Sequence, residues 1–320
     1  MGKKHYAGIA AALSVIIFLL IAIAVPFDVT GYLIFAFGTV FLAITVSITI
    51  AFVIVVVTRL DYVKRQVQTF RRFRYLLALM IKRDFVTRYR RSVLGVLWSL
   101  LNPLLTMLVL TLVFSFIFRW DIPNFPVYLI SGQVIFNFFS ESTTTAMGSI
   151  VGNAGIIKKV YVPKYIFPVS RVLSSLINLA FSFIAFLIVF IITGESFRWT
   201  ILLIPIPILY VFVFSLGVGM MLSAVSVFFR DIGYLYSVLT TLLMFLTPIF
   251  YPVSMLSERM FHFVHFNPIF HFVNYFRALT LDGVVPGLWV NVICIGFALS
   301  ALCGGLYATM AKQDKFILYL

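Results

Sequence analysis

The chain has 320 residues, of which 62% are hydrophobic and only 11% are charged, and its mean hydropathy is +1.11. This composition excludes a soluble globular domain, and apolar runs of about 20 residues without alternation favour membrane-spanning helices over barrel strands. The formal net charge of +14 does not indicate nucleic-acid binding, because the Lys and Arg residues gather in loops and in one amphipathic segment, as membrane orientation requires. The two cysteines lie in one apolar run on opposite helix faces, so we expect neither a disulfide nor a metal site from them.

Two apolar runs open the chain. Residues 7–25 predict a membrane span, although the small residues at 22–24 also fit the cleavage site of a signal peptide. After a short turn, the second run covers residues 32–57. We expect an N-terminal transmembrane hairpin over residues 1–58, whose second helix ends on the cytoplasmic side because a basic segment follows it.

That basic segment, residues 59–92, carries 11 of the 24 Lys and Arg residues. Apolar residues recur in it at steps of three and four, which predicts an amphipathic helix lying at the cytoplasmic membrane surface. Asp84 stands four residues before Arg88, the order that stabilises an ion pair along a helix. Lipid anchoring and binding of a soluble partner both explain such a helix.

The remaining residues, 93–320, predict a core of six further spans. The expected spans are residues 93–118, 127–147, 165–193, 201–229, 234–250 and 288–310. The aromatic segment 252–287 is interrupted by prolines and polar residues, which favours re-entrant or interfacial helices on the outer side. This layout puts 20 basic residues inside and four outside, and so favours eight spans with both termini cytoplasmic.

The sequence carries no Gly-x-x-x-x-Gly-Lys-Ser/Thr motif and no plausible catalytic set, so we expect no enzyme and no bound cofactor. Glu141 is the most prominent charge inside an expected span, and it either lines a transport path or only bonds to nearby hydroxyl groups. His262, His265 and His271 have a spacing that metal ligands use, but an interfacial role is favoured because no cysteine or close carboxylate accompanies them.

Four stretches in register carry a resemblance to a known family. They are KRDFVTRYRRSVLGVLWSLLNPLLTMLVLTLVFSFIF, NAGIIKKVYVPKYIFP, FFRDI, and TPIFYP followed by FNPIFHFVNYFR. The chain resembles, over about residues 65–315, the membrane (permease) subunits of polysaccharide ABC exporters, which move O-antigen, capsule and teichoic acid chains. The hairpin at residues 1–58 is a departure, because the family core lacks it.

The resemblance implies an all-α, six-helix core, a homodimer, and two copies of a separate ABC ATPase subunit that binds ATP and Mg²⁺. It places an interface helix at about Tyr75–Arg91, a main coupling helix at Asn153–Tyr161, a smaller contact at Arg230-Asp231, and outer re-entrant helices within 252–287. The ATPase-coupling residues that we expect are Arg83, Asp84, Arg88, Asn153, Ile157, Lys158, Lys159, Tyr161, Arg230 and Asp231. The residues that we expect along a substrate path are Arg88, Arg90, Arg91, Trp98, Phe138, Phe139, Glu141 and Tyr251.

We therefore expect a multi-pass protein of the bacterial cytoplasmic membrane. It would be the permease of an ATP-driven exporter for a lipid-linked glycan, carried by undecaprenyl, and its partners would be membrane lipids, a second copy and the ATPase. Arg88, Arg90 and Arg91 suit the phosphate-bearing head of such a substrate, although lipid contact explains them too. The alternative is an ATP-independent flippase or a scaffold of a glycan-synthesis complex.

Overall fold

The computed structural model describes residues 68–90, 92–117 and 122–320, so the expected N-terminal hairpin lies outside the described residues. The described part is helical and contains no strand. The helices are α4 (Arg74–Tyr89), α5 (Leu97–Ile117), α6 (Phe125–Met147), α7 (Ser149–Gly152), α8 (Ala154–Ile157), α9 (Ile166–Ile192), α10 (Pro205–Phe228), α11 (Ile232–Leu246), α12 (Glu258–His265), α13 (Pro268–Arg277), α14 (Leu288–Lys312) and α15 (Phe316–Tyr319). Short helical turns are η1 (Trp199–Leu203), η2 (Val253–Met255), η3 (Ala278–Asp282) and η4 (Gln313–Lys315).

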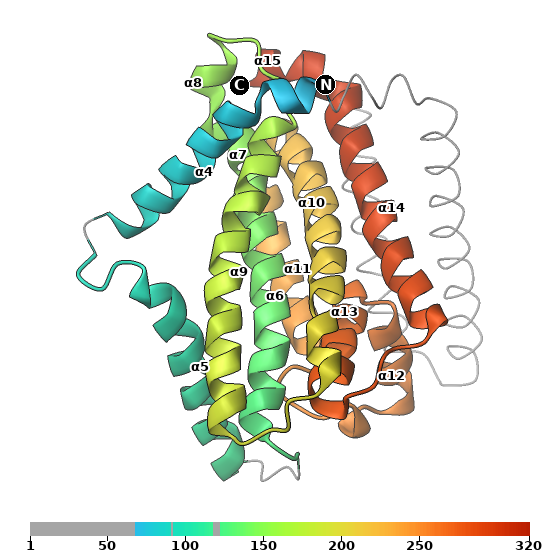
Figure 1. Cartoon of the computed structure of the whole chain (residues 1–320). Helices are drawn as coiled ribbons and strands as arrows, with labels where there is room; N and C mark the ends of the chain where they lie inside the picture. The colour runs from blue at the N-terminus through green and yellow to red at the C-terminus, as the bar shows by residue number, and fades with distance from the viewer. Residues whose placement is uncertain (1–67, 91, 118–121) are drawn as a thin grey trace.

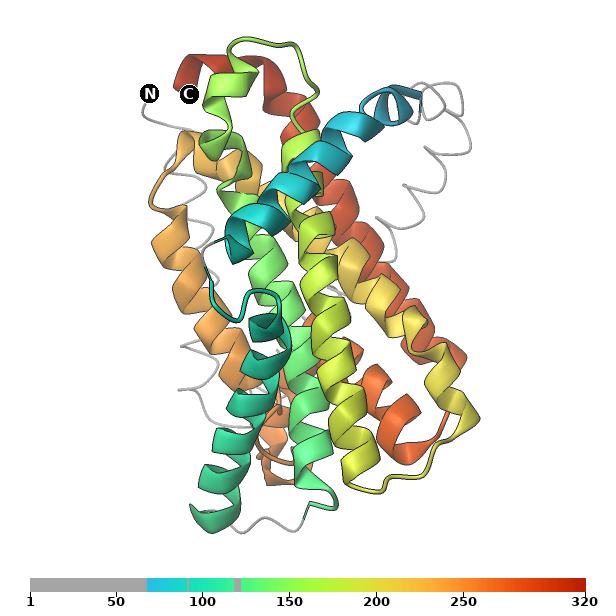
Figure 2. The same cartoon turned by 60° about the vertical axis from the view of Figure 1, so that its left-hand side comes forward.

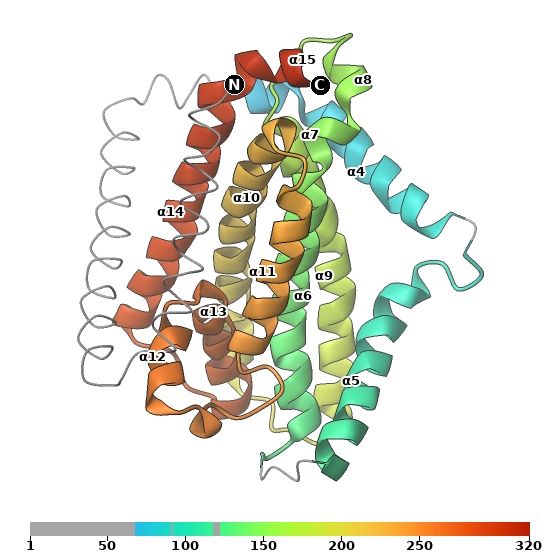
Figure 3. The same cartoon turned by 180° about the vertical axis from the view of Figure 1, so that it is seen from behind.

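The long helices α5, α6, α9, α10, α11 and α14 run along one common direction (Figure 1). Helices α4, α7, α8 and α15 and the C-terminus lie at one end of this bundle, called the α4 end below, and α12 and α13 lie toward the opposite end (Figures 1 and 3). Helix α4 crosses the bundle obliquely at its own end, in front of α9 (Figure 2).

The long helices overlap the expected spans. By length and composition, four helical stretches of the described residues are apolar enough to cross a membrane, namely Leu97–Phe114, Ile166–Ile192, Trp199–Phe228 and Leu288–Ala311. Helix α11 is apolar but shorter, and α6 carries more polar residues than the others. The described part of the chain is therefore that of a helical, polytopic membrane protein.

Local sequence signals explain where several helices begin. Proline stands in the first turn of α6, α10 and α13, where its missing N–H group costs no helix hydrogen bond. The side chain of Ser257 accepts a hydrogen bond from the backbone N–H of Met260 and caps α12, and Asn267 does the same for Ile269 and caps α13. The Asn267 cap stands at the break between α12 and α13, where Pro268 opens the second helix.

The main core surrounds α6, which is buried on most of its faces between α9, α10 and α13. Helix α13 packs on α6, α10 and α14, and its Phe272 and Phe276 are fully buried. Helix α13 is therefore a buried part of the bundle, and its position relative to the membrane surface, re-entrant or interfacial, stays a prediction. The aromatic side chains fill the space between three long helices, and neither the spacing nor the composition of the segment could show this.

A second cluster at the α4 end holds α4 against the bundle. Leu77 and Met80 are buried there with Ile157 of α8, Phe167 of α9 and Phe316 of α15. The amphipathic helix was expected to lie at the cytoplasmic membrane surface, and the structure adds that this part of its apolar face contacts protein. Other apolar side chains of the same segment stay exposed, namely Phe70, Tyr75, Leu79 and Val86.

Candidate functional site

A polar groove of about 810 Å³ lies between α4, α5, α6 and α9. Each of the three long helices contributes one row of polar residues at steps of three or four, which places each row on a single helix face. The rows are Ser99, Asn102 and Thr106 on α5, Asn137, Ser140, Glu141 and Thr144 on α6, and Asn178 and Ser182 on α9. Hydroxyl and amide groups thus face one another within apolar helices.

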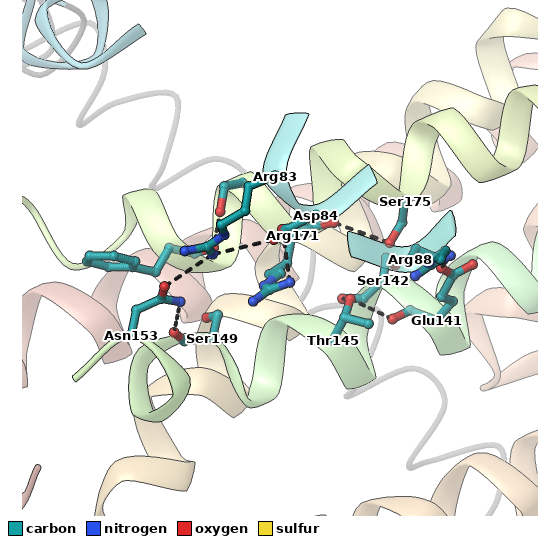
Figure 4. Close-up of polar contacts among 12 residues, drawn as sticks. Arg83, Asp84, Arg88, Glu141, Ser142, Thr145, Ser149, Asn153, Arg171 and Ser175 are labelled. Atoms are coloured by element: carbon teal, nitrogen blue, oxygen red, sulfur yellow. Dashed lines mark hydrogen bonds and ion pairs between the residues drawn. The ribbon is translucent and has the colours of Figure 1, made fainter. Parts of the chain in front are cut away.

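An ion pair stands where α4 meets this groove. Arg88 Nη1 of α4 lies 2.5 Å from Glu141 Oε1 of α6 (Figure 4). The Asn178 amide of α9 donates to the same oxygen at 2.5 Å. The Tyr89 hydroxyl donates to Asn178 Oδ1 at 3.0 Å and also contacts the Ser99 hydroxyl of α5. This network joins four helices.

Arg88 keeps its positive charge beside Glu141. Burial lowers the pKa of Arg88, but the Glu141 carboxylate and its hydrogen bond outweigh this, so the pKa lies above its ordinary value. The guanidinium group therefore stays protonated at every physiological pH.

A second polar network lies one turn earlier on α4, beside a cavity of about 540 Å³. Asp84 Oδ2 forms an ion pair with Arg171 Nη1 of α9 at 2.9 Å, and Arg83 Nη2 lies 3.4 Å from Asp84 Oδ1. Arg83 also donates to Asn153 Oδ1 at 3.3 Å, and the Asn153 amide donates to the Ser149 carbonyl at 2.7 Å (Figure 4). These contacts connect α4 with α9 and with the α7–α8 loop.

The expected ion pair between Asp84 and Arg88 is not formed. Arg171 pairs with Asp84 and Glu141 pairs with Arg88, so each α4 charge has a partner on another helix. The Asp84 side chain is only 10% exposed, so its carboxylate gains more from the adjacent Arg171 guanidinium group than from a solvated pair with Arg88 along one helix.

The other residues expected to couple to an ATPase gather at the α4 end. Ile157 is buried in the second cluster, whereas Lys158, Lys159 and Tyr161 are exposed on the loop after α8. The exposed Arg230-Asp231 turn between α10 and α11 lies at the same end (Figure 3). The structure thus brings the expected coupling residues to one end of the molecule.

The residues that were expected along a substrate path do not lie together in the structure. Trp98 lines the groove together with Arg88 and Glu141, but Phe138 and Phe139 do not line it and are buried within the core. Tyr251 lies beyond the far end of α11, where its hydroxyl donates to the Phe245 carbonyl.

Two further basic residues, Arg90 and Arg91, were expected along the path. Arg90 is exposed just after α4 and does not line the groove, and Arg91 lies outside the described residues. The sequence interpretation missed Arg171, Asn178 and Tyr89. The first two recur at helical spacing with Ser174, Ser175 and Ser182 inside the apolar run of α9, and that polar row was the available signal.

The comparisons with known proteins agree with a membrane protein built from apolar helices. Residues 75–281 match the family model of ABC-2 type transporters. The chain belongs to this family. It is 32% identical over 224 residues to the O-antigen export system permease protein RfbA of Myxococcus xanthus, an alignment that covers 69% of the chain and 86% of the relative.

Two further relatives are also named as export or transport proteins. An RfbA protein of Klebsiella pneumoniae is 31% identical over 230 residues, covering 70% of the chain and 88% of the relative. The polysialic acid transport protein KpsM of Escherichia coli is 26% identical over 240 residues, covering 73% of the chain and 92% of the relative. The matched region of this ABC-2 chain includes α4, the groove and both polar networks.

Proposed function

We propose that this chain is the permease subunit of an ATP-driven exporter that moves a polysaccharide out across the bacterial cytoplasmic membrane. The observation that carries the proposal is the polar groove, which begins at the α4 end and extends between apolar helices of an ABC-2 type transporter. Hydroxyl and amide groups pair well with sugar hydroxyl groups, which both donate and accept hydrogen bonds. The names of the O-antigen and polysialic acid relatives support the same class of substrate.

The groove favours a homodimer, because it is open along one side of the single chain. Asn102, Asn137 and Thr144 are exposed there although they belong to long helices of a membrane protein. Polar side chains facing acyl chains are costly, so they require water or protein opposite them. A second copy covering the open side would enclose a hydrophilic path between two six-helix cores, with both termini on the cytoplasmic side.

We assign the coupling of transport to ATP hydrolysis to the α4 end. Two copies of an ABC ATPase, carrying ATP and Mg²⁺, would bind the exposed loop after α8 and the Arg230-Asp231 turn. The Arg83–Asn153 hydrogen bond and the Asp84–Arg171 ion pair connect that loop to α4 and α9, and thus provide a route from the partner to the groove. We infer a lipid-linked glycan as substrate, on an undecaprenyl carrier, with teichoic acid as a second possible chain.

Transport by liposomes that contain the chain and its ATPase partner tests this function. We expect ATP-dependent movement of an undecaprenyl-linked glycan, and a loss of about tenfold or more when Lys158→Ala and Tyr161→Asp are combined, because an exposed aromatic anchor at an interface is commonly worth more than 1 kcal/mol. Both side chains are exposed, so the variant should fold. Trp199→Ala is the control, because Trp199 is another exposed aromatic residue and lies in η1, between the end of α9 and the start of α10.

Two results would contradict the proposal. An ATP-independent flippase would move the glycan at the full rate without the ATPase. A scaffold would support no movement in either case, although glycan synthesis in cells would depend on the chain.

A further inference from the structure

The charged side chains that line the described groove form a single ion pair. Among the described residues that line it, Arg88 and Glu141 are the charged side chains, and the others carry hydroxyl, amide, aromatic or apolar groups. The lining that the structure describes therefore carries one positive and one negative charge. Yet the pair is accessible, since 43% of the Arg88 side chain and 30% of the Glu141 side chain remain exposed.

We propose that the groove binds the diphosphate-sugar headgroup of a glycolipid, and that the phosphate groups displace the Glu141 carboxylate from Arg88. This inference rests on the proposed export function and names the part of the substrate that the groove recognises. Glu141 is then a competing anion that occupies the guanidinium group until a substrate of higher charge arrives.

The exposure of the pair makes the exchange feasible. An ion pair that remains accessible to water is weak, because solvent screens it, whereas a buried pair would resist displacement. A phosphate group offers the planar guanidinium two oxygens at once, and a diphosphate carries more negative charge than a carboxylate. After displacement, Glu141 Oε1 keeps the Asn178 amide as a donor, so the released carboxylate is still hydrogen-bonded.

The groove has room and chemistry for the attached sugar. Its volume of about 810 Å³ lies in the range that holds a ligand of several rings or groups. Asn102, Asn137 and Ser140 supply donors and acceptors around it, and the indole ring of Trp98 stands in its wall. Glu141 also gives selectivity, because the single negative charge of an ordinary anionic phospholipid competes less well for Arg88 than a diphosphate does.

Fluorescence of Trp98 provides a direct readout of occupancy. The full-length chain is reconstituted without the ATPase in nanodiscs of zwitterionic phosphatidylcholine, with Trp120, Trp199 and Trp289 replaced by Phe. Undecaprenyl diphosphate is the probe. We expect it to change the Trp98 emission with saturation, and Arg88→Gln to weaken binding by about tenfold or more because the bidentate contact is lost.

Glu141→Gln separates the proposal from a purely structural role. Removing the competing anion should strengthen binding several-fold, whereas loss of a structural partner would weaken it. Arg90→Gln removes the same charge two residues away, outside the groove, and should leave binding unchanged. Melting curves of each variant report on folding.

Two further probes show whether the diphosphate group or the lipid chain causes the change in Trp98 emission. Undecaprenol, which lacks phosphate, should bind much more weakly than the diphosphate, and inorganic diphosphate should compete at high concentration. Equal binding of undecaprenol, no effect of Arg88→Gln, or weaker binding in Glu141→Gln would each overturn the proposal. Because no ATPase is present, these outcomes are independent of whether ATP-driven export is observed.

Discussion

Arg277, the last residue of α13, is a buried cation with only 5% of its surface exposed. Its guanidinium group donates to the carbonyls of Pro248, Tyr128 and Ile249 at 2.7, 3.0 and 3.3 Å, and to the Ser131 hydroxyl at 3.3 Å. It also stands 3.5 Å over the Tyr128 ring. The five donors of arginine thus hold the irregular segment after α11 against the start of α6 and the end of α13.

We expect Arg277→Lys to destabilise the protein although it keeps the charge. One ammonium group cannot reach carbonyls on two sides, and each buried acceptor left without a donor costs about 1–3 kcal/mol, so a total of about 3 kcal/mol or more is expected. Thermal unfolding of the detergent-purified protein measures this. Ser131→Ala, which removes one neutral partner, should cost only about 1 kcal/mol, and equal melting temperatures for both variants would contradict this role.

Helices α10 and α14 approach each other closely because glycine stands at the contact. A Cβ atom at Gly305 would overlap the carbonyl of Gly217, and a Cβ atom at Gly217 would overlap the backbone of Ala301. The Thr309 hydroxyl donates to the Met220 carbonyl at 3.3 Å across the same contact. Small residues at helix crossings are typical of membrane proteins, where van der Waals packing rather than hydrophobicity drives association.

Adjacent glycines of α14 allow a matched test of this contact. We expect Gly305→Ala to lower stability by about 1–3 kcal/mol, because the added methyl group must push the two helices apart. Gly304→Ala meets open space and should raise helix stability by up to about 1 kcal/mol. Melting temperatures of the two variants should therefore move in opposite directions, and a rise for both would refute the close packing.

The elements of this fold were easier to predict than their contacts. Apolar length and charged boundaries place α9, α10 and α14 within a few residues, because a membrane span imposes both. The partner of Arg88 could not be predicted, since Glu141 lies 53 residues away and the pairing depends on how α4 crosses the bundle. Phe138 and Glu141 are likewise close in sequence, yet α6 directs the first into the core and the second into the groove.

At the scale of the whole molecule, one side of the bundle differs from the others. Helix α5 contacts α6 and α9, and the residues of its apolar stretch Leu97–Phe114 are nowhere fully buried. It lies on the side of the bundle away from α14 (Figures 1 and 3). The polar rows of α5 and α6 both line the groove beside it, which places this groove at the surface of one chain rather than inside it.

Asn137 and Met221 provide a test of whether that surface is wet. Both side chains are exposed in the single chain, both lie within the last three turns of a long helix at the α4 end, and they differ in that Asn137 lines the groove. In a background with Cys294→Ala and Cys303→Ala, we expect Asn137→Cys to react with a charged methanethiosulfonate reagent at least about tenfold faster than Met221→Cys, because only the water-exposed thiol forms the reactive thiolate readily. Reaction rates in reconstituted membranes measure the difference.

An undecaprenyl-linked glycan should slow the reaction of Asn137→Cys alone, since it would fill the groove. Equal slow rates for both cysteines would mean that acyl chains cover the groove, and the path between two copies would then have to be abandoned.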